Sequence, residues 1–555
     1  MKPGDAVTTR ADVVAGVAVG LLLVPQAMAY AQLAGLPPAM GLWCAAIAGP
    51  VAALLGRCHQ LNAGPVAMTS VVAAGALAPF AAPGSPDWIA LAGLLCLLVA
   101  GVRLLLAAVR GAVLADLISQ PVLAGFSIAA ALVIPATQLP LLVGARPDAD
   151  APLFLAAGAL LCSPWHWHPA TVAMGASCLI ALWSLKRWLP RLPGMLLVIA
   201  AATATAWACG YDGATVGALP LGLPDTVRPS TDWHTALALL PGAALVAVIG
   251  LAEVVTVTRT TAAMTRQEID TDRELAGQGA AALATAWIAP VVPSASLSRS
   301  MLTLREGGRT RLSAAVSGVV ALLAALCCGP LLTHLPLAAL AAGVVIALGP
   351  LLDPRPLLRA WRVSRSDGFA GGATLVATLV LAPQLVTGLA IGVGSSLLLF
   401  LRKLMRPRVV ELSLHPDGTW RDAERHGLAL SDEIAILRWE GRLSFASAAA
   451  FEDAVLATMA RRPRLRLLVL AAEGLNDLDA SGVEALLRMH ERLGGNGIVL
   501  AVASCRAPLL DVMRRARLPE AFLAEAAHRT VGSAVNRNAM RLGLGPQPWD
   551  PPTGP

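Results

Sequence analysis

The sequence has few charged and aromatic residues, and it lacks the short motifs of the common enzyme classes. Only 14% of its 555 residues are charged and 4% are aromatic, whereas 56% are hydrophobic and the mean hydropathy is +0.67. Soluble domains carry about a quarter charged residues, so this composition indicates that much of the chain lies in a membrane. Because the sequence contains no phosphate-binding Gly-Lys loop, catalytic triad signature or HExxH, we do not expect an enzyme.

Cysteine and histidine provide no pattern for a metal site. Eight of the nine cysteines precede residue 409, and no two of them form a CxxC pair. His166 and His168 are two residues apart in a predicted outer loop, where they offer too few ligands for a metal ion. The sequence therefore predicts neither a metal nor a cofactor.

The scarcity of charge is confined to the first part of the chain. Residues 1–408 contain 25 Lys and Arg and 17 Asp and Glu, whereas residues 409–555 contain 17 and 18. The positive excess thus lies in the apolar part, which argues against a nucleic-acid partner. We expect a transmembrane domain at 1–408, a linker at 409–430, a small soluble domain at 431–542 and a tail at 543–555.

Breaks at proline, glycine and clustered charges divide the apolar part into fourteen segments. A spanning helix needs about 20 apolar residues, and fewer where two half-helices meet. Residues 1–10 show no cleavable signal peptide, so the first segment is expected to be an uncleaved helix. The predicted spans are 12–30, 39–56, 65–79, 87–109, 117–136, 170–188, 194–209, 236–258, 274–289, 295–304, 312–331, 336–352, 368–382 and 385–402.

The distribution of basic residues predicts how these segments are oriented across the membrane. If the N-terminus is inside, 21 of the 25 Lys and Arg of the apolar part lie on the cytoplasmic side. This asymmetry predicts a multi-pass protein of the inner (cytoplasmic) membrane with both termini in the cytoplasm.

Two short, polar, proline-containing segments mark corresponding points of the two halves. Segment three begins after Gly64-Pro65 and segment ten after Pro293-Ser294, about 230 residues later. Seven segments per half is an odd number, so the second repeat (236–402) must be inverted relative to the first (12–209). Paired, interrupted helices of this kind indicate a transport site at the membrane midplane.

Three charged residues lie in the interior of predicted segments, away from the first and last few residues. A central arginine costs a few kcal/mol to insert, so Arg299 is either a functional residue or a helix-end arginine that extends to the interface. Arg103 lies near a predicted cytoplasmic end and is expected to extend to the interface. Glu253, deep in segment eight, either couples transport to a proton or cation or forms a structural ion pair with Arg299.

The first and tenth segments suggest an anion site. Pro25 is expected to break segment one, so that Gln26 and Tyr30 face one cavity; a simple kink is the alternative. Two half-helices that begin near residues 65 and 295 would direct free N–H groups and their dipoles at one point, which favours an anion over a cation. The hydroxyls of Ser294, Ser296 and Ser298 would add donors.

These features resemble the SulP family of anion transporters, which includes sulfate permeases and bicarbonate transporters. The similar stretches are 12–16, 25–31, 34–43, 56–57, 64–67, 274–275 and 296–300. The resemblance implies two inverted seven-helix repeats divided into core and gate domains, a homodimer and an elevator-like movement. It implies a substrate pocket of Gln26, Tyr30, Val66, Ala67, Leu297, Ser298 and Arg299, with the coupling ion at Glu253. Val257 stands where sodium-coupled relatives often have threonine, which favours protons over sodium.

The tail alternates predicted strands and helices. Strands are expected at 434–440, 465–471 and 498–503, and helices at 448–460, 483–493 and 508–517, which indicates a largely parallel sheet. This pattern resembles a STAS domain. Ser481 matches a serine that can be phosphorylated in bacterial STAS regulators, although Asp479 or Ser481 could simply cap the helix.

The leading hypothesis is proton-coupled secondary transport of a small inorganic anion, with sulfate the first choice and bicarbonate the second. A dicarboxylate transporter or an anion exchanger of the same fold remains open. Nucleobase permeases typically lack a STAS tail and bind uncharged bases through carboxylates, which argues against them. A membrane-anchored STAS scaffold is the alternative from another class, although it would not need a polar pocket in lipid. Beyond the anion, the expected partners are the coupling ion, membrane lipid and a second copy of the chain.

Overall fold

The computed structural model describes residues 3–146, 151–189, 192–217, 224, 226–327, 329–382, 384–526, 530–545 and 547. Residues 527–529 of the predicted soluble domain, and all of the predicted tail except 543–545 and 547, lie outside this set. The chain forms two compact units, Met1–Leu397 and Leu398–Pro555, and each is described by itself.

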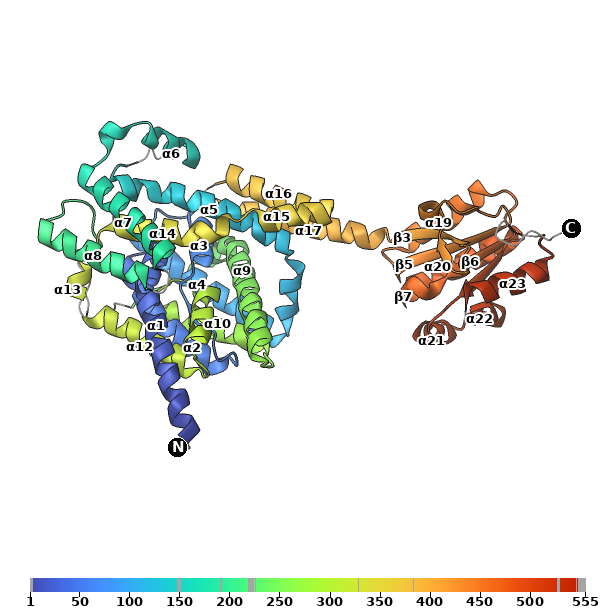
Figure 1. The fold of residues 1–555 in the computed structure, drawn as a ribbon, viewed down its shortest axis with the longest axis horizontal. Helices are drawn as coiled ribbons and strands as arrows, with labels where there is room; N and C mark the ends of the chain where they lie inside the picture. The colour runs from blue at the N-terminus through green and yellow to red at the C-terminus, as the bar shows by residue number, and fades with distance from the viewer. Residues whose placement is uncertain are drawn as a thin grey trace. The chain divides into compact units, whose positions relative to one another are not determined.

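A helix covers each of the fourteen predicted segments (Figure 1). These helices are α1 (Pro3–Leu33), α2 (Pro38–Leu55), α3 (Ala67–Leu77), α4 (Pro86–Ala108), α5 (Gln120–Val143), α7 (Pro169–Trp188), α8 (Gly194–Cys209), α9 (Trp233–Thr265), α10 (Thr271–Thr285), α11 (Leu297–Arg305), α12 (Leu312–Cys327), α14 (Leu337–Leu348), α16 (Arg365–Val380) and α17 (Leu385–Met405). The sequence did not predict the short helices α6 (Leu153–Leu161), α13 (Gly329–Leu332) and α15 (Arg355–Val363), nor the 3₁₀ turns η1 (Gly111–Leu117), η2 (Pro164–His166) and η3 (Gly349–Leu352).

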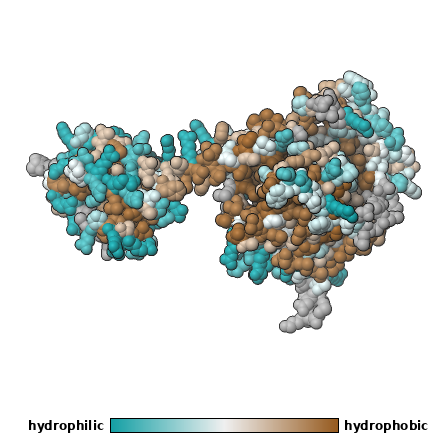
Figure 2. Space-filling model, turned by 180° about the vertical axis from the view of Figure 1, so that it is seen from behind, coloured by the Kyte–Doolittle hydropathy of each residue, from teal (hydrophilic) through white to brown (hydrophobic). Residues whose placement is uncertain are grey.

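Seven of the described helices are long and apolar enough to cross a membrane, namely α1, α2, α4, α5, α7, α9 and α17. Helices α3, α8, α12 and α14 are apolar but shorter. Many large apolar side chains face outward, such as Leu54 at 77% exposure and Val380 at 75%. Figure 2 shows the broad apolar surface of this unit. A surface of this kind is suited to contact with lipid rather than water.

Helix α1 is continuous through Pro25, so the predicted break in the first segment is wrong. Proline removes one backbone donor, but a long helix can tolerate that loss where neighbouring helices surround it. Helix α1 packs against α2 and α12, and Pro25 itself is buried.

The two halves of this unit meet through a pair of two-residue strands. Strand β1 (Ala63–Gly64) pairs antiparallel with β2 (Ser294–Ala295), although about 230 residues separate them in the sequence. Helix α3 begins shortly after β1 and α11 shortly after β2. The strand pairing therefore places the first turns of both helices beside each other.

The second unit is built on a six-stranded sheet. Its strand order is β4-β3-β5-β6-β8, with β7 also paired to β5. The neighbours β5, β6 and β8 are parallel, as predicted. The strands are β3 (Arg408–Leu414), β4 (Trp420–Asp422), β5 (Ile434–Leu443), β6 (Leu467–Ala471), β7 (Leu475–Leu478) and β8 (Val499–Ala503).

The predicted linker at 409–430 is wrong, because this segment is part of the folded unit. Strand β3 pairs antiparallel with β5, β4 continues the sheet beyond it, and a short helix, α18 (Ala423–His426), follows. Both strands lie toward one edge of the sheet, where charged side chains are tolerated. The strands were missed because their charged residues conceal the apolar alternation.

Helices cover both faces of this sheet. On one face, alternate apolar residues of β5 join a core with α19 (Ala448–Arg461), α20 (Ala480–Gly495), α21 (Ala507–Arg515) and α22 (Glu520–Ala526). On the other face, Ile434 and Ile436 pack in a cluster with α23 (Val531–Leu542). Because successive side chains of a strand point to opposite faces, the alternation in β5 supplies both cores.

Candidate functional site

The candidate site is centred on the first turns of α3 and α11. The register of the strand pair, Gly64 with Ser294 and Ala63 with Ala295, sets these turns side by side. Val66 and Ser296 are the N-cap residues, and neither side chain caps its helix. The first N–H groups of a helix have no partner within the helix. Two positive helix ends therefore meet where the halves cross.

Arg299 connects these two helices from the inside. Its side chain is 1% exposed; Nε donates to Asn62 Oδ1 at 2.8 Å and Nη1 donates to the Pro65 carbonyl at 3.1 Å. Asn62 is held in turn by Ser317, to whose hydroxyl it donates at 2.9 Å. The guanidinium is buried, so the alternative of an arginine that extends to the interface is wrong. Nη2 has no hydrogen-bond partner among the residues that the structure describes.

A cavity of about 600 Å³ opens beside the two helix ends. Five of the seven predicted substrate residues line it, namely Tyr30, Val66, Ala67, Leu297 and Ser298. Gln26 is half-buried and Arg299 is buried, and neither belongs to the lining. The cavity is lined mostly by apolar residues, with hydroxyl groups such as those of Ser296 and Ser298 among them, and the buried Arg299 charge lies behind this lining.

Glu253 lies in α9 and lines the same cavity. Its carboxylate accepts a hydrogen bond from the Ser294 hydroxyl of β2. The structure describes both Glu253 and Arg299 and records no ion pair between them, so the alternative of a structural ion pair is not observed. The carboxyl group instead lies beside the cavity, with the Ser294 hydroxyl as its hydrogen-bond donor.

Arg103 in α4 is buried, contrary to the prediction that it extends to the interface. Its side chain is 0% exposed, and Nη1 donates to the Pro293 carbonyl at 2.7 Å, just before β2. Position along the helix suggested a helix-end arginine, but that position does not reveal which face of α4 the side chain occupies. Sequence reasoning therefore missed a second cation next to the site.

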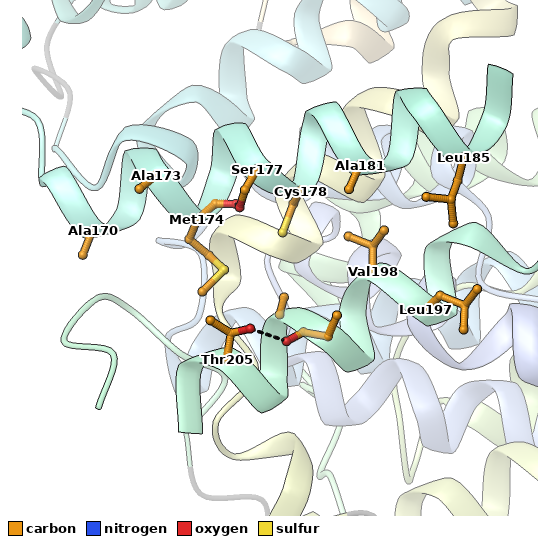
Figure 3. Close-up of a pocket in the computed structure, with 12 residues that line it drawn as sticks. Ala170, Ala173, Met174, Ser177, Cys178, Ala181, Leu185, Leu197, Val198 and Thr205 are labelled. Carbon is orange, nitrogen blue, oxygen red and sulfur yellow. Dashed lines mark hydrogen bonds between the residues drawn. The ribbon is translucent and has the colours of Figure 1, made fainter. Parts of the chain in front are cut away.

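A second cavity lies between α7 and α8 and has a different character (Figure 3). It measures about 740 Å³, and residues such as Met174, Cys178, Leu185 and Val198 line it. Its described lining holds no charged side chain. The Thr205 hydroxyl is also engaged, since it donates to the Ala201 carbonyl of its own helix at 2.8 Å. This groove offers an anion no favourable interaction.

In the second unit, Asp479 caps α20. Its carboxylate accepts from the Gly482 N–H at 2.8 Å and from the Phe445 N–H at 3.0 Å. Of the two predicted capping residues, the structure thus selects Asp479. Ser481 is the second helical residue and is half-buried.

Comparison with known proteins agrees with these observations. Residues 9–374 match the model of the sulfate permease family, and residues 428–534 match the STAS domain. A protein named "Probable sulfate transporter" from Mycobacterium tuberculosis (strain ATCC 25618 / H37Rv) is 33% identical over 95% of this chain and 94% of its own length. "Probable sulfate transporter 4.2" of Arabidopsis thaliana is 29% identical, over 92% of this chain and 78% of its own length.

Solved structures show the same fold. SLC26A9 superposes with a TM-score of 0.87 at 20% identity, over 98% of this chain and 92% of its own. The transmembrane domain of the cyanobacterial bicarbonate transporter BicA superposes with a TM-score of 0.60 at 21% identity. This match covers 69% of this chain and 97% of the BicA domain. The protein is thus a polytopic helical membrane protein of the SLC26 fold with an α/β STAS domain. This chain belongs to the sulfate permease (SulP/SLC26) family of anion transporters and is not an enzyme.

Proposed function

We propose that this protein is a secondary active transporter that carries sulfate across the cytoplasmic membrane together with a proton. The observation that carries the proposal is the β1–β2 pair, which brings the N-termini of α3 and α11 together beside a cavity. Unpaired N–H groups at two helix ends attract an anion and offer nothing to a cation. The relatives named as sulfate transporters support sulfate as the first choice.

In this proposal the anion lies between the two helix ends. The backbone at Val66 and Ala67, and at Leu297 and Ser298, donates hydrogen bonds to its oxygens. Tyr30 and Gln26 of α1 add polar groups on a third side. Because Arg299 is buried behind the cavity lining, it acts through its charge and by fixing the geometry of the two helices.

Glu253 is proposed as the coupling residue. Glu253 lines the cavity, so a proton that binds to its carboxylate removes a negative charge next to the anion and lowers their electrostatic repulsion. Val257, one turn further along α9, has no side-chain oxygen to offer a sodium ion. Protons are therefore the proposed coupling ion, and sodium is the alternative that the experiment below distinguishes.

Transport would proceed by an elevator-like movement of a core domain against a gate domain in a homodimer. The fourteen helices would form two inverted seven-helix repeats, with both termini in the cytoplasm. The membrane domain would extend to about residue 408, and the STAS domain would include strand β3. Phosphorylation of Ser481 is proposed as a modification of the STAS domain.

The test is uptake of radiolabelled sulfate into proteoliposomes that contain the purified full chain. We expect saturable accumulation that requires an inward proton gradient and does not respond to a sodium gradient. Accumulation driven only by sodium would reject proton coupling. Uptake of bicarbonate or a dicarboxylate without sulfate would keep the site and change the substrate. No movement of any anion would favour a membrane-anchored STAS scaffold.

A further inference from the structure

Arg103 is a buried cation with an incomplete set of hydrogen bonds. Nη1 bonds to the Pro293 carbonyl, whereas Nε and Nη2 have no partner among the described residues. The side chain is 0% exposed. A buried guanidinium without a nearby negative charge costs several kcal/mol. The fold must therefore supply a negative charge close to it, either from the protein or from the substrate.

Helix α9 supplies this charge at Glu253. Nη2 of Arg103 lies against α9 at Gly250, where an added Cβ would be only 2.0 Å from it. Gly250 is thus needed to admit the guanidinium. Glu253 follows three residues later, so it lies on the same side of the helix. The guanidinium of Arg103 and the carboxylate of Glu253 therefore lie near the same stretch of α9, without a hydrogen bond between them.

Three described groups lie around this carboxylate. Ser294 of β2 donates a hydrogen bond to it, Tyr30 of α1 lines the same cavity, and Arg299 of α11 is buried behind that lining. The site therefore contains two fixed positive charges, on Arg103 and Arg299, and one charge that a proton can remove. Its net charge is +1 with Glu253 ionised and +2 with Glu253 protonated.

We infer that Arg103 is a specificity-determining residue that makes the site select a divalent anion together with a proton. The Coulomb energy scales with the product of the charges, so each fixed cation attracts a dianion twice as strongly as a monoanion. The low-dielectric interior preserves this difference. Protonation of Glu253 brings the site to +2, which matches a dianion such as sulfate. The inference rests on the proposed anion site and adds the charge class of its substrate.

The test compares a dianion with a monoanion on the purified full chain. Binding of sulfate and of nitrate is measured by the rise in melting temperature with anion concentration, which gives an apparent Kd for each. Four variants are compared with the wild type: Arg103→Gln, Arg103→Lys, Gly250→Ala and, as a control, Arg110→Gln. Arg110 is an exposed arginine just beyond the end of α4.

The wild type and Arg110→Gln should prefer sulfate over nitrate. Arg103→Gln should reduce this preference about tenfold, which corresponds to about 1.4 kcal/mol. Arg103→Lys should retain most of it because the charge is kept. Gly250→Ala adds a methyl group where Nη2 lies and should reduce the preference without removing a charge. If Arg103→Gln does not fold, the sulfate preference of Gly250→Ala is compared with that of Arg103→Lys. A lower preference in Gly250→Ala than in Arg103→Lys would support the inference.

Two results would overturn the inference while leaving the proposed function intact. One is an unchanged sulfate preference in both Arg103→Gln and Gly250→Ala. The other is a wild type that binds sulfate yet prefers nitrate. A wild type that responds to neither anion, and also transports neither, would overturn the inference and the proposed function together.

Discussion

Replacement of Arg299 by alanine tests the assignment of the anion site. The side chain lies at the third position of α11, and the residues at the first two positions, Leu297 and Ser298, line the cavity. In the proposed site the guanidinium would lie within about one helical turn of the anion. Its loss removes a positive charge from behind the substrate and also removes two hydrogen bonds.

The structure allows both effects to be estimated. At an effective dielectric constant of about 20, a charge roughly 7 Å from a dianion contributes about 5 kcal/mol. Since 1.4 kcal/mol is about a tenfold change, a loss of at least a hundredfold in sulfate affinity is expected even if neighbouring groups compensate in part. The buried acceptors Asn62 Oδ1 and Pro65 O lose their partner, at about 1–3 kcal/mol each. Removal of the buried charge itself offsets some of that cost.

The assay is the initial rate of sulfate uptake per folded molecule in proteoliposomes, with the folded fraction taken from gel filtration and a melting curve. Arg299→Ala should show no measurable uptake, and Arg299→Lys should retain a small part of it because one ammonium cannot replace both hydrogen bonds. Arg110→Ala, which removes an exposed arginine, should behave like the wild type. A folded Arg299→Ala protein with uptake close to that of the wild type would refute the site assignment.

Three further predictions concern single residues. Glu253→Gln should abolish accumulation driven by a proton gradient yet allow sulfate exchange; accumulation that persists would exclude Glu253 as the coupling residue. Asp12 is buried and accepts two backbone N–H bonds from the loop after α11, at 2.6 and 3.0 Å. Asp12→Ala should therefore lower the free energy of unfolding by about 3 kcal/mol with little change in uptake per folded molecule, and an unchanged melting curve would contradict this. Asp479→Ala should destabilise the STAS unit by about 1–2 kcal/mol, whereas Ser481→Ala should change its stability by less than about 0.5 kcal/mol in denaturant titrations; the reverse order would contradict the capping assignment.

The helices and two charged residues of the candidate site could be predicted because their signals are local. Long apolar runs and clustered arginines identify the segments without any knowledge of packing. Arg299 and Glu253 were noticed because a charge inside an apolar segment is rare. The approach of two half-helices near residues 65 and 295 was predicted from two similar polar stretches at matching points of the halves, whereas the strand pairing of Gly64 with Ser294 was not.

Other features depend on tertiary packing and could not be predicted. Asn62 receives the Arg299 bond although 237 residues separate the two. Arg103 was misjudged because only the packing of α4 against α9 shows that its guanidinium is buried at Gly250. Pro25 does not break α1, since the neighbouring helices support it. No local pattern contains this information.

The central claim is that a divalent oxyanion binds where the N-termini of α3 and α11 meet. The most direct measurement is a crystal structure of the full chain soaked with selenate, a sulfate analogue whose selenium gives an anomalous signal. The account predicts one strong peak in the cavity beside Val66 and Ser298, in front of Arg299. A well-diffracting crystal with its selenium elsewhere in the membrane unit, such as the groove between α7 and α8, would contradict it.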